Sequence, residues 1–223
     1  MSPTLAARTA ILKKLSLESR SKVGATPSES IPRDYIRHGS LDTDARVAKM
    51  IERLREYDAE VAECSPAELA SEIAVQLARS GHNTFVAPPG VPREWLATGF
   101  NWKLDGELAI EEIERCDGVL TACFCGIADS GTIVLHHSSA EGRRAITLLP
   151  DWHLCILRSS QIVETLPEYF DRCAKIPALV TWISGPSATA DIEMTRIKGV
   201  HGPRFLNVIV VKDRETENEG TRE

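Results

Sequence analysis

Polar and small residues that could bind or transform a small anion occur at three places along this chain of 223 residues. The first is the turn Asp129-Ser130-Gly131-Thr132, which offers a carboxylate, hydroxyls and free backbone N–H groups. Nearby Arg143 or Arg144 could add a charge-assisted fork for a carboxylate or phosphate. We predict a catalytic role for Asp129 and ligand binding by Ser130, Gly131, Thr132 and Arg143. A capped turn without a ligand is the alternative, because Asp and Gly also suit ordinary turns.

The second place is Asp151-Trp152-His153. A carboxylate can fix the tautomer of a neighbouring imidazole and raise its pKa, so Asp151 and His153 could act together as a general acid and base. In an extended segment both side chains point to the same face. A structural histidine whose hydrogen bonds are satisfied within the core is the alternative.

The third place follows the apolar run Ala178–Ile183, which predicts a buried strand. Ser184-Gly185-Pro186-Ser187 ends this run, and ligands of open α/β sheets bind in loops at such strand ends. Ser187 or Thr189 could cap a short helix over Ala188–Arg196. We predict that the ligand-binding residues of this part are Ser184, Gly185, Ser187, Thr189, Asp191 and His201. A capped connection without a ligand is again the alternative.

The metal-binding and nucleotide-binding patterns are weak. Cys123 and Cys125 would share one face of a strand, but no third and fourth ligand follows at metal-site spacing. His136 and His137 alternate in direction on a strand and cannot ligate one metal from the same face. Glycine-rich nucleotide-binding motifs and clustered iron–sulfur cysteines do not occur. We therefore expect no metal and no cofactor bound by this chain, and six reduced cysteines.

Composition narrows the class of protein. The formal net charge of -6 gives no electrostatic reason to expect nucleic acid or an anionic membrane as a partner. The beginning of the sequence lacks an apolar signal core, and no apolar run is long enough to span a bilayer. We expect a cytoplasmic protein without membrane insertion.

Apolar periodicity predicts alternating helices and strands, and hence a three-layer α/β fold with a mixed sheet. Purely parallel pairing is the less favoured arrangement. The expected domains are an N-terminal helix and extended arm over residues 1–43, one α/β domain over 44–212 and a disordered charged tail over 213–223. Helices are expected at 5–17, 44–57, 65–80, 93–98, 109–115 and 161–175. Strands are expected at 59–64, 83–87, 118–124, 132–136, 145–149, 154–157, 178–183 and 205–211.

Four ordered blocks resemble the lactate utilization protein C family, whose members carry a LUD domain. The blocks are Gly126–Leu135, Gly142–His153, Gln161–Glu164 and Ser184–Glu193, the last followed by Val200-His201-Gly202-Pro203. The resemblance implies the NagB/RpiA/CoA-transferase-like fold, which includes ribose-5-phosphate isomerase and glucosamine-6-phosphate deaminase. It also implies a role beside two iron–sulfur partner proteins that oxidise L-lactate to pyruvate.

Three functional classes remain open. The first is a non-redox component of a lactate-oxidising assembly, with iron–sulfur clusters in its partners and a small carboxylate as ligand. The second is a free-standing enzyme on a phosphosugar or an acyl or carboxylate substrate. The third is a regulatory carboxylate-binding protein. We favour the first, because the resemblance supports it, although one fold hosts many functions.

Overall fold

The computed structural model describes residues 7–15, 34–189, 197–198 and 201–213. The chain divides into two units, residues 1–35 and residues 36–223. In the first unit residues 7–15 form a helix. The second unit holds every other helix and strand described here. None of the helices in the described part of the chain combines the length and apolar character that crossing a membrane requires.

A six-stranded sheet forms the centre of the larger unit, in the strand order β1-β12-β7-β4-β2-β3. Every neighbouring pair in it is parallel. The central strands are nearly continuous apolar runs because both faces of the sheet are covered. The strand bounds are β1 Glu60–Cys64, β12 Phe205–Val211, β7 Trp152–Arg158, β4 Gly118–Ala122, β2 Thr84–Ala87 and β3 Asn101–Leu104.

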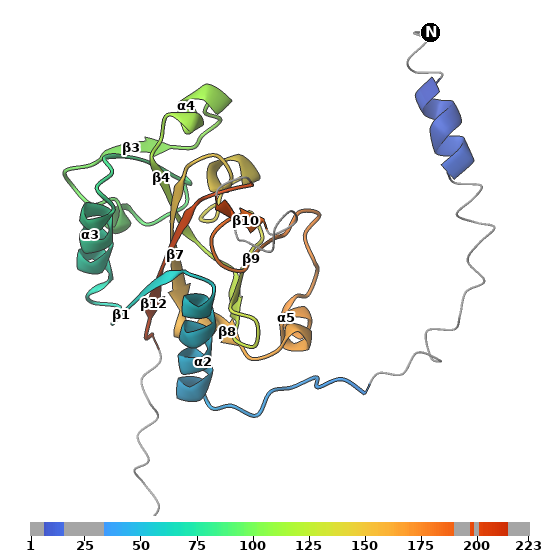
Figure 1. Cartoon of the computed structure of the whole chain (residues 1–223), viewed down its shortest axis with the longest axis horizontal. Coiled ribbons are helices and arrows are strands. Elements are labelled where there is room, and N and C mark those ends of the chain that lie inside the picture. Colours follow the sequence, from blue (N-terminus) through green and yellow to red (C-terminus); the bar gives the residue numbers. More distant parts are fainter. Residues whose placement is uncertain (1–6, 16–33, 190–196, 199–200, 214–223) are drawn as a thin grey trace, which may run out of the picture. The chain divides into compact units, whose positions relative to one another are not determined.

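Helix α3 (Leu69–Ser80) covers one face of this sheet, and Figure 1 shows it to the left of β7 and β12. The helix begins at Leu69, later than the expected start at Ser65, whose hydroxyl and backbone N–H donate to the carboxylate of Glu68 in the turn before the helix. Gly81 ends the helix in the left-handed conformation that glycine adopts without strain. Its apolar residues Leu69, Ile73 and Leu77 enter a core with one face of the sheet.

Helix α2 (Thr43–Glu56) and a second sheet cover the other face. Asp42 caps α2 by accepting a hydrogen bond from the N–H of Ala45 at 2.8 Å. The apolar residues of α2 recur at helical spacing and pack with alternate residues of β7 and β12. These helix residues are Val47, Met50, Ile51 and Leu54. The three layers are therefore α3, the six-stranded sheet, and α2 together with the second sheet.

The second sheet has four strands in the order β8-β5-β6-β9 and contains both parallel and antiparallel pairs. Helix α5 (Leu166–Arg172) covers its outer face, where Tyr169 enters a small core. The strand bounds are β5 Cys125–Ile127, β6 Thr132–Leu135, β8 Ile162–Val163 and β9 Thr181–Ile183. The antiparallel hairpin β5–β6 places the turn Asp129-Ser130-Gly131 at its tip.

Short elements complete the unit. They are the helix α4 (Ile110–Glu114) and the 3-10 turns η2 (Arg93–Trp95), η3 (Arg144–Thr147) and η4 (Ser159–Gln161). The two-stranded hairpin of β10 (Ala188–Thr189) and β11 (Ile197–Lys198) is antiparallel.

The α/β class is confirmed, but the six-stranded sheet is purely parallel, which was the less favoured arrangement, and several local expectations are wrong. Residues 145–149 are not a strand but lie mostly in η3, where Ile146 is buried. The helix expected from residue 161 begins only at Leu166, because Thr165 caps it. Ala188 and Thr189 lie in β10 instead of a helix; residues 190–196 lie outside the described part. Finally, β9 is an edge strand with Trp182 exposed, not a buried strand.

The larger unit extends at both ends beyond residues 44–212, the bounds expected for the α/β domain. The backbone N–H of Gly39 donates to Glu168, and that of Leu41 donates to Glu164. Residues 36–42 therefore pack on the α/β unit. At the other end, Asp213 accepts hydrogen bonds from Ser159 and Ser160 and so stays attached beyond β12.

Candidate functional site

A polar cavity of about 220 Å³ lies between the two sheets, at the amino end of β7 and β12. Arg144 and Thr147 of η3 line it together with His153 of β7. The loop after β9 and the segment before β12 close the cavity with Ser184 and His201. We call this cavity the Arg144 pocket. It joins side chains from four separate segments of the sequence.

His153 is buried, with 1% of its surface exposed. Its Nε2 lies 2.8 Å from the Oγ1 of Thr121 on the neighbouring strand β4. Burial and the positive charge of Arg144 lower the pKa of His153 to about 4. The imidazole is therefore neutral near pH 7 and can offer a hydrogen bond without a charge.

Arg144 is half-buried, and burial lowers its pKa from the ordinary value. Its Nη1 donates to the carbonyl oxygen of Thr147 at 3.0 Å and to the hydroxyl of Thr147 at 3.2 Å. Among the described residues it has no carboxylate partner. An arginine remains charged at any ordinary pH, so Arg144 places a positive charge at the pocket wall that no carboxylate of the described residues pairs.

Arg143, the arginine predicted to bind the ligand, points elsewhere. Its guanidinium donates to both carboxylate oxygens of Asp105, each at 2.9 Å, and also to the carbonyl of Leu108. The side chain of Asp105 is only 3% exposed, and its pair with Arg143 lowers its pKa. Arg143 thus holds the loop after β3 by hydrogen bonds, and Arg144 is the arginine that faces the pocket.

The predicted turn and the predicted loop do meet. The hydroxyl of Thr132 lies 2.7 Å from that of Ser130 and 2.8 Å from that of Ser184. Ser184 faces the Arg144 pocket, whereas Ser130 and Thr132 line a second hollow of about 340 Å³ on the far side of Trp182. A chain of three hydroxyls therefore connects the two hollows.

Asp129 and Gly131 anchor the hairpin tip against α2. The carboxylate of Asp129 pairs with Lys49 and is about half exposed at the second hollow. Gly131 has a positive φ of 61°, and a Cβ atom there would lie 2.7 Å from the Cβ of Arg53. Only glycine fits this approach. Asp129 lies outside the set of residues that line the Arg144 pocket.

The expected pair of Asp151 and His153 is not formed. Asp151 accepts hydrogen bonds from Arg204, including two from its Nε at 2.7 Å, and this partner lowers the pKa of Asp151. His153 instead contacts Thr121. The two side chains of the supposed acid and base therefore have different partners, because Arg204 precedes β12 directly beside the start of β7.

The loop after β9 is held by the segment before β12. The N–H of Ser187 donates to the carbonyl of Pro203 at 2.8 Å, and the N–H of His201 donates to the hydroxyl of Ser187 at 3.0 Å. Gly185 has a φ of 79° and packs against Tyr57. The amide of Ser187 is therefore occupied within the fold. Thr189 belongs to β10, and Asp191 lies outside the described residues.

All six cysteines are free thiols, and five of them are buried. Cys123 lies in the core between the two sheets, whereas Cys125 lies in the core beneath α5, so the two do not share a face. A hydrogen bond to Cys155 and burial raise the pKa of Cys123, and burial raises that of Cys125 to about 11. Such thiols are poor nucleophiles and poor metal ligands near pH 7.

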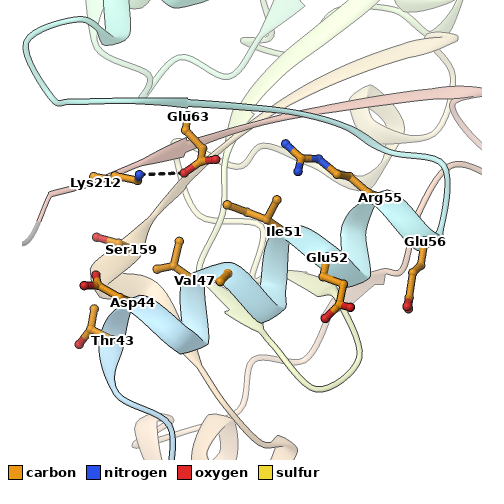
Figure 2. Close-up of a pocket in the computed structure, with 11 residues that line it drawn as sticks. Thr43, Asp44, Val47, Ile51, Glu52, Arg55, Glu56, Glu63, Ser159 and Lys212 are labelled. Carbon is orange, nitrogen blue, oxygen red and sulfur yellow. Dashed lines mark ion pairs between the residues drawn. The ribbon is translucent and has the colours of Figure 1, made fainter.

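A larger hollow, about 940 Å³, is an open groove between α2 and β1 (Figure 2). Its polar rim includes Glu63, which pairs with Lys212, and its lining contains no histidine. The Arg144 pocket is the better candidate for small-molecule recognition, because a cation and a buried neutral imidazole converge there.

Sequence reasoning missed Thr121 and Thr147 and left the choice between Arg143 and Arg144 open. Thr121 sits inside an apolar run, and Thr147 lies in a segment whose pattern predicted a strand. The adjacent pair Arg143-Arg144 was the available signal. Only the 3-10 turn that begins at Arg144 determines which of them faces the cavity.

Comparisons with known proteins agree on one family. The lactate utilization protein C of Deinococcus radiodurans is 38% identical over 204 residues, covering 90% of this chain and 94% of that protein. A protein of the same name from Bacillus velezensis is 26% identical over 226 residues, covering 92% and 93%. The crystal structure of a DUF162 family protein from Deinococcus radiodurans is 36% identical, with a TM-score of 0.65, and the match covers 77% of this chain and 99% of that one. The model of the LUD domain matches residues 47–211, and the chain therefore belongs to the LUD domain family.

Proposed function

We propose that this protein is the non-redox component of an assembly that oxidises L-lactate to pyruvate, and that it binds a small carboxylate in the Arg144 pocket. Relatives named lactate utilization protein C support a role in lactate utilization. The observation that carries the proposed site is the charge of Arg144 inside a polar cavity, where no carboxylate of the described residues pairs with it. A carboxylate would supply the missing counter-charge.

The surroundings of Arg144 suit a hydroxy acid. In the proposed complex the guanidinium of Arg144 holds the carboxylate, and the hydroxyl of Ser184 and the neutral imidazole of His153 are available to the substituent on the next carbon. The cavity, at about 220 Å³, is smaller than the roughly 300–1,000 Å³ typical of pockets for larger ligands. This size favours an acid of a few carbon atoms.

Lactate oxidation releases two electrons, and no side chain described here is an evident carrier for them. Iron–sulfur clusters of partner proteins receive these electrons in our proposal. The contribution of this chain is then to bind and orient the acid. Isolated protein should accordingly fail to reduce an artificial acceptor with L-lactate, and should restore lactate oxidation in extracts that lack it.

Ligand-induced thermal stabilisation tests the site. A ligand that binds only the folded state raises its stability by mass action. L-lactate or pyruvate should raise the melting temperature of the wild type, and Arg144→Met should remove the gain. Arg115→Met, at an exposed position after α4, is the matched control and should keep it. Ser187→Asp, which brings a negative charge to the same loop, should also reduce the gain.

Other outcomes would favour the alternatives. Stabilisation by ribose 5-phosphate or glucosamine 6-phosphate, followed by turnover in the isolated protein, would favour the free-standing enzyme. The regulatory carboxylate-binding class would be favoured if a carboxylate stabilised the protein but the added protein did not restore lactate oxidation in extracts that lack it. Equal stabilisation of wild type and Arg144→Met would show that the acid does not bind through this arginine.

A further inference from the structure

The groove between α2 and β1 runs along an open edge of the six-stranded sheet. β1 is the terminal strand of the sheet, and among the described residues only β12 pairs with it, along one edge. The N–H of Lys212 donates to the carbonyl of Cys64 at 2.9 Å, which shows that the polar backbone groups of Cys64 point toward β12. Because successive residues of a strand alternate in direction, those of Val61 and Glu63 point to the open edge.

The floor of the groove is apolar. Figure 2 shows Val47 and Ile51 rising from α2 toward the strand above them, with Glu63 and Lys212 at the far side. A strand added beside β1 would lay alternate side chains over this floor. Its other side chains would face the opposite surface of the sheet, near α3.

The charges around this edge are mostly negative. α2 directs Arg46 and Lys49 to the second sheet, where they contact Ile162 and Asp129. The groove itself is lined by the four carboxylates and two cations Asp44, Glu52, Glu56, Glu63, Arg55 and Lys212.

Two of these four acids form ion pairs, Glu56 with Arg53 and Glu63 with Lys212. Asp44 and Glu52 have no ion-pair partner among the residues that the structure describes, whereas Glu63 pairs with Lys212 at 2.9 Å. On the other face, the carboxylates of Glu68 and Glu72 help to raise the pKa of Cys64 at the end of β1, which places them near this strand. Both faces beside the open edge are therefore acidic.

We propose that the open edge of β1 accepts an extended, positively charged segment of a partner protein, which pairs with the backbone of Val61 and Glu63. Strand addition supplies the main-chain hydrogen bonds, and charge complementarity selects a segment in which Lys or Arg alternates with apolar residues. Lys212 competes with such a segment for Glu63. The groove lies apart from the Arg144 pocket, so this inference stands independently of carboxylate binding.

Binding of two labelled peptides to the full-length protein tests the proposal. One peptide alternates Lys and Val over ten residues, and the other has the same side chains but carries a methyl group on every backbone nitrogen. The first should bind and the second should not, because an N-methylated amide on either edge of the peptide cannot donate to a strand ladder. Amide hydrogen exchange at Val61 and Glu63 should slow only with the first peptide.

Variants separate the backbone contribution from the charge contribution. Val61→Pro removes an N–H that faces the open edge and should weaken binding about tenfold, whereas Val61→Ala retains that N–H. Glu63→Gln should weaken binding about threefold. Lys212→Met releases Glu63 from its internal partner and should strengthen binding by a similar factor. Glu111→Gln, on the exposed surface of α4, should leave binding unchanged.

Equal binding of the two peptides would overturn the proposal, since electrostatic attraction alone would then explain the affinity. Equal affinity in Glu63→Gln, Lys212→Met and the wild type would overturn it as well. If the wild-type protein alone self-associates and Val61→Pro disrupts this, the edge is occupied by a second copy instead of a partner. Melting temperatures within a few degrees of wild type would verify that each variant is folded.

Discussion

Arg144 lies beside His153 in a cavity between two sheets, and its positive charge helps burial to lower the pKa of the imidazole to about 4. A cation and a neutral imidazole at one wall are suited to hold an anion, and no carboxylate among the residues that line this cavity competes with it. General-acid catalysis by His153 near pH 7 is disfavoured because the protonated form is scarce, and the low pKa also makes the neutral imidazole a weak general base.

The depressed pKa of His153 predicts how folding stability depends on pH. An unfolded histidine titrates near 6.5, whereas the folded one titrates near 4, so acid protonates the unfolded chain first. The stability contributed by the neutral His153 is fully present above about pH 6.5 and is lost as the pH falls toward 4. The loss approaches about 3 kcal/mol.

His153→Gln tests this prediction, because glutamine retains a hydrogen-bonding group toward Thr121 but does not titrate. Urea unfolding between pH 7 and pH 4.5 should show a flatter dependence in the variant than in the wild type. In Arg144→Met, NMR titration should find the pKa of His153 higher than in the wild type. Identical pH dependence of stability in His153→Gln and the wild type would mean that this imidazole is not held neutral.

Substitutions of the adjacent arginines should affect different properties: Arg143 supports folding stability, whereas Arg144 supports ligand binding. Arg143→Met leaves Asp105 buried without its partner and should lower the free energy of unfolding by about 2 kcal/mol. Because the pKa of Asp105 is depressed, the contribution of this pair is present at neutral pH and is lost in acid. The carboxylate-induced rise in melting temperature should survive in Arg143→Met. Loss of that rise would assign ligand binding to Arg143 after all.

Two glycines with positive φ provide a matched comparison. Gly131→Ala should cost about 2 kcal/mol or more, because a Cβ there meets both the side chain and the backbone of Arg53. Gly81→Ala, which meets nothing within 4 Å, should cost only about 1 kcal/mol from backbone strain. Chemical denaturation measures both. Equal costs would show that the close approach of the hairpin tip to α2 contributes nothing.

The sequence predicted the elements that carry their own local signals. β12 was expected with its observed bounds because seven apolar or nearly apolar residues follow one another, and α3 was expected from Ser65 in the turn before it and Gly81 at its end. The start of α5 was missed although Thr165 and Glu168 form a capping box, because an apolar period continued upstream of it. β3 was missed because four residues with mixed polarity depend on pairing with β2 for their conformation.

The candidate site was only partly predictable, because it also depends on contacts between distant parts of the chain. The contact of Thr132 with Ser184 joins residues 52 positions apart, and hydroxyl chemistry suggested each of them separately. The separation of Asp151 from His153 depends on Arg204, which reaches Asp151 only because β12 lies beside β7. Spacing within one strand carries no information about such a partner.

The last prediction concerns where the N-terminal arm can be removed. Gly39 and Leu41 donate backbone hydrogen bonds to Glu168 and Glu164, and Thr165 donates its hydroxyl to the carbonyl of Arg37. Deletion of residues 1–35 leaves these contacts intact and should lower the melting temperature by no more than about 2 °C. Deletion of residues 1–41 leaves the carboxylates of Glu164 and Glu168 without these N–H donors and should lower the melting temperature by about 5 °C or more.

Calorimetry of both truncations compares their melting temperatures directly, and complementation of extracts that lack the protein then reports on assembly. Full activity of the shorter deletion in such extracts would exclude residues 1–35 from the proposed interaction with iron–sulfur partners. A selective loss of activity at an unchanged melting temperature would assign residues 1–35 to that interaction.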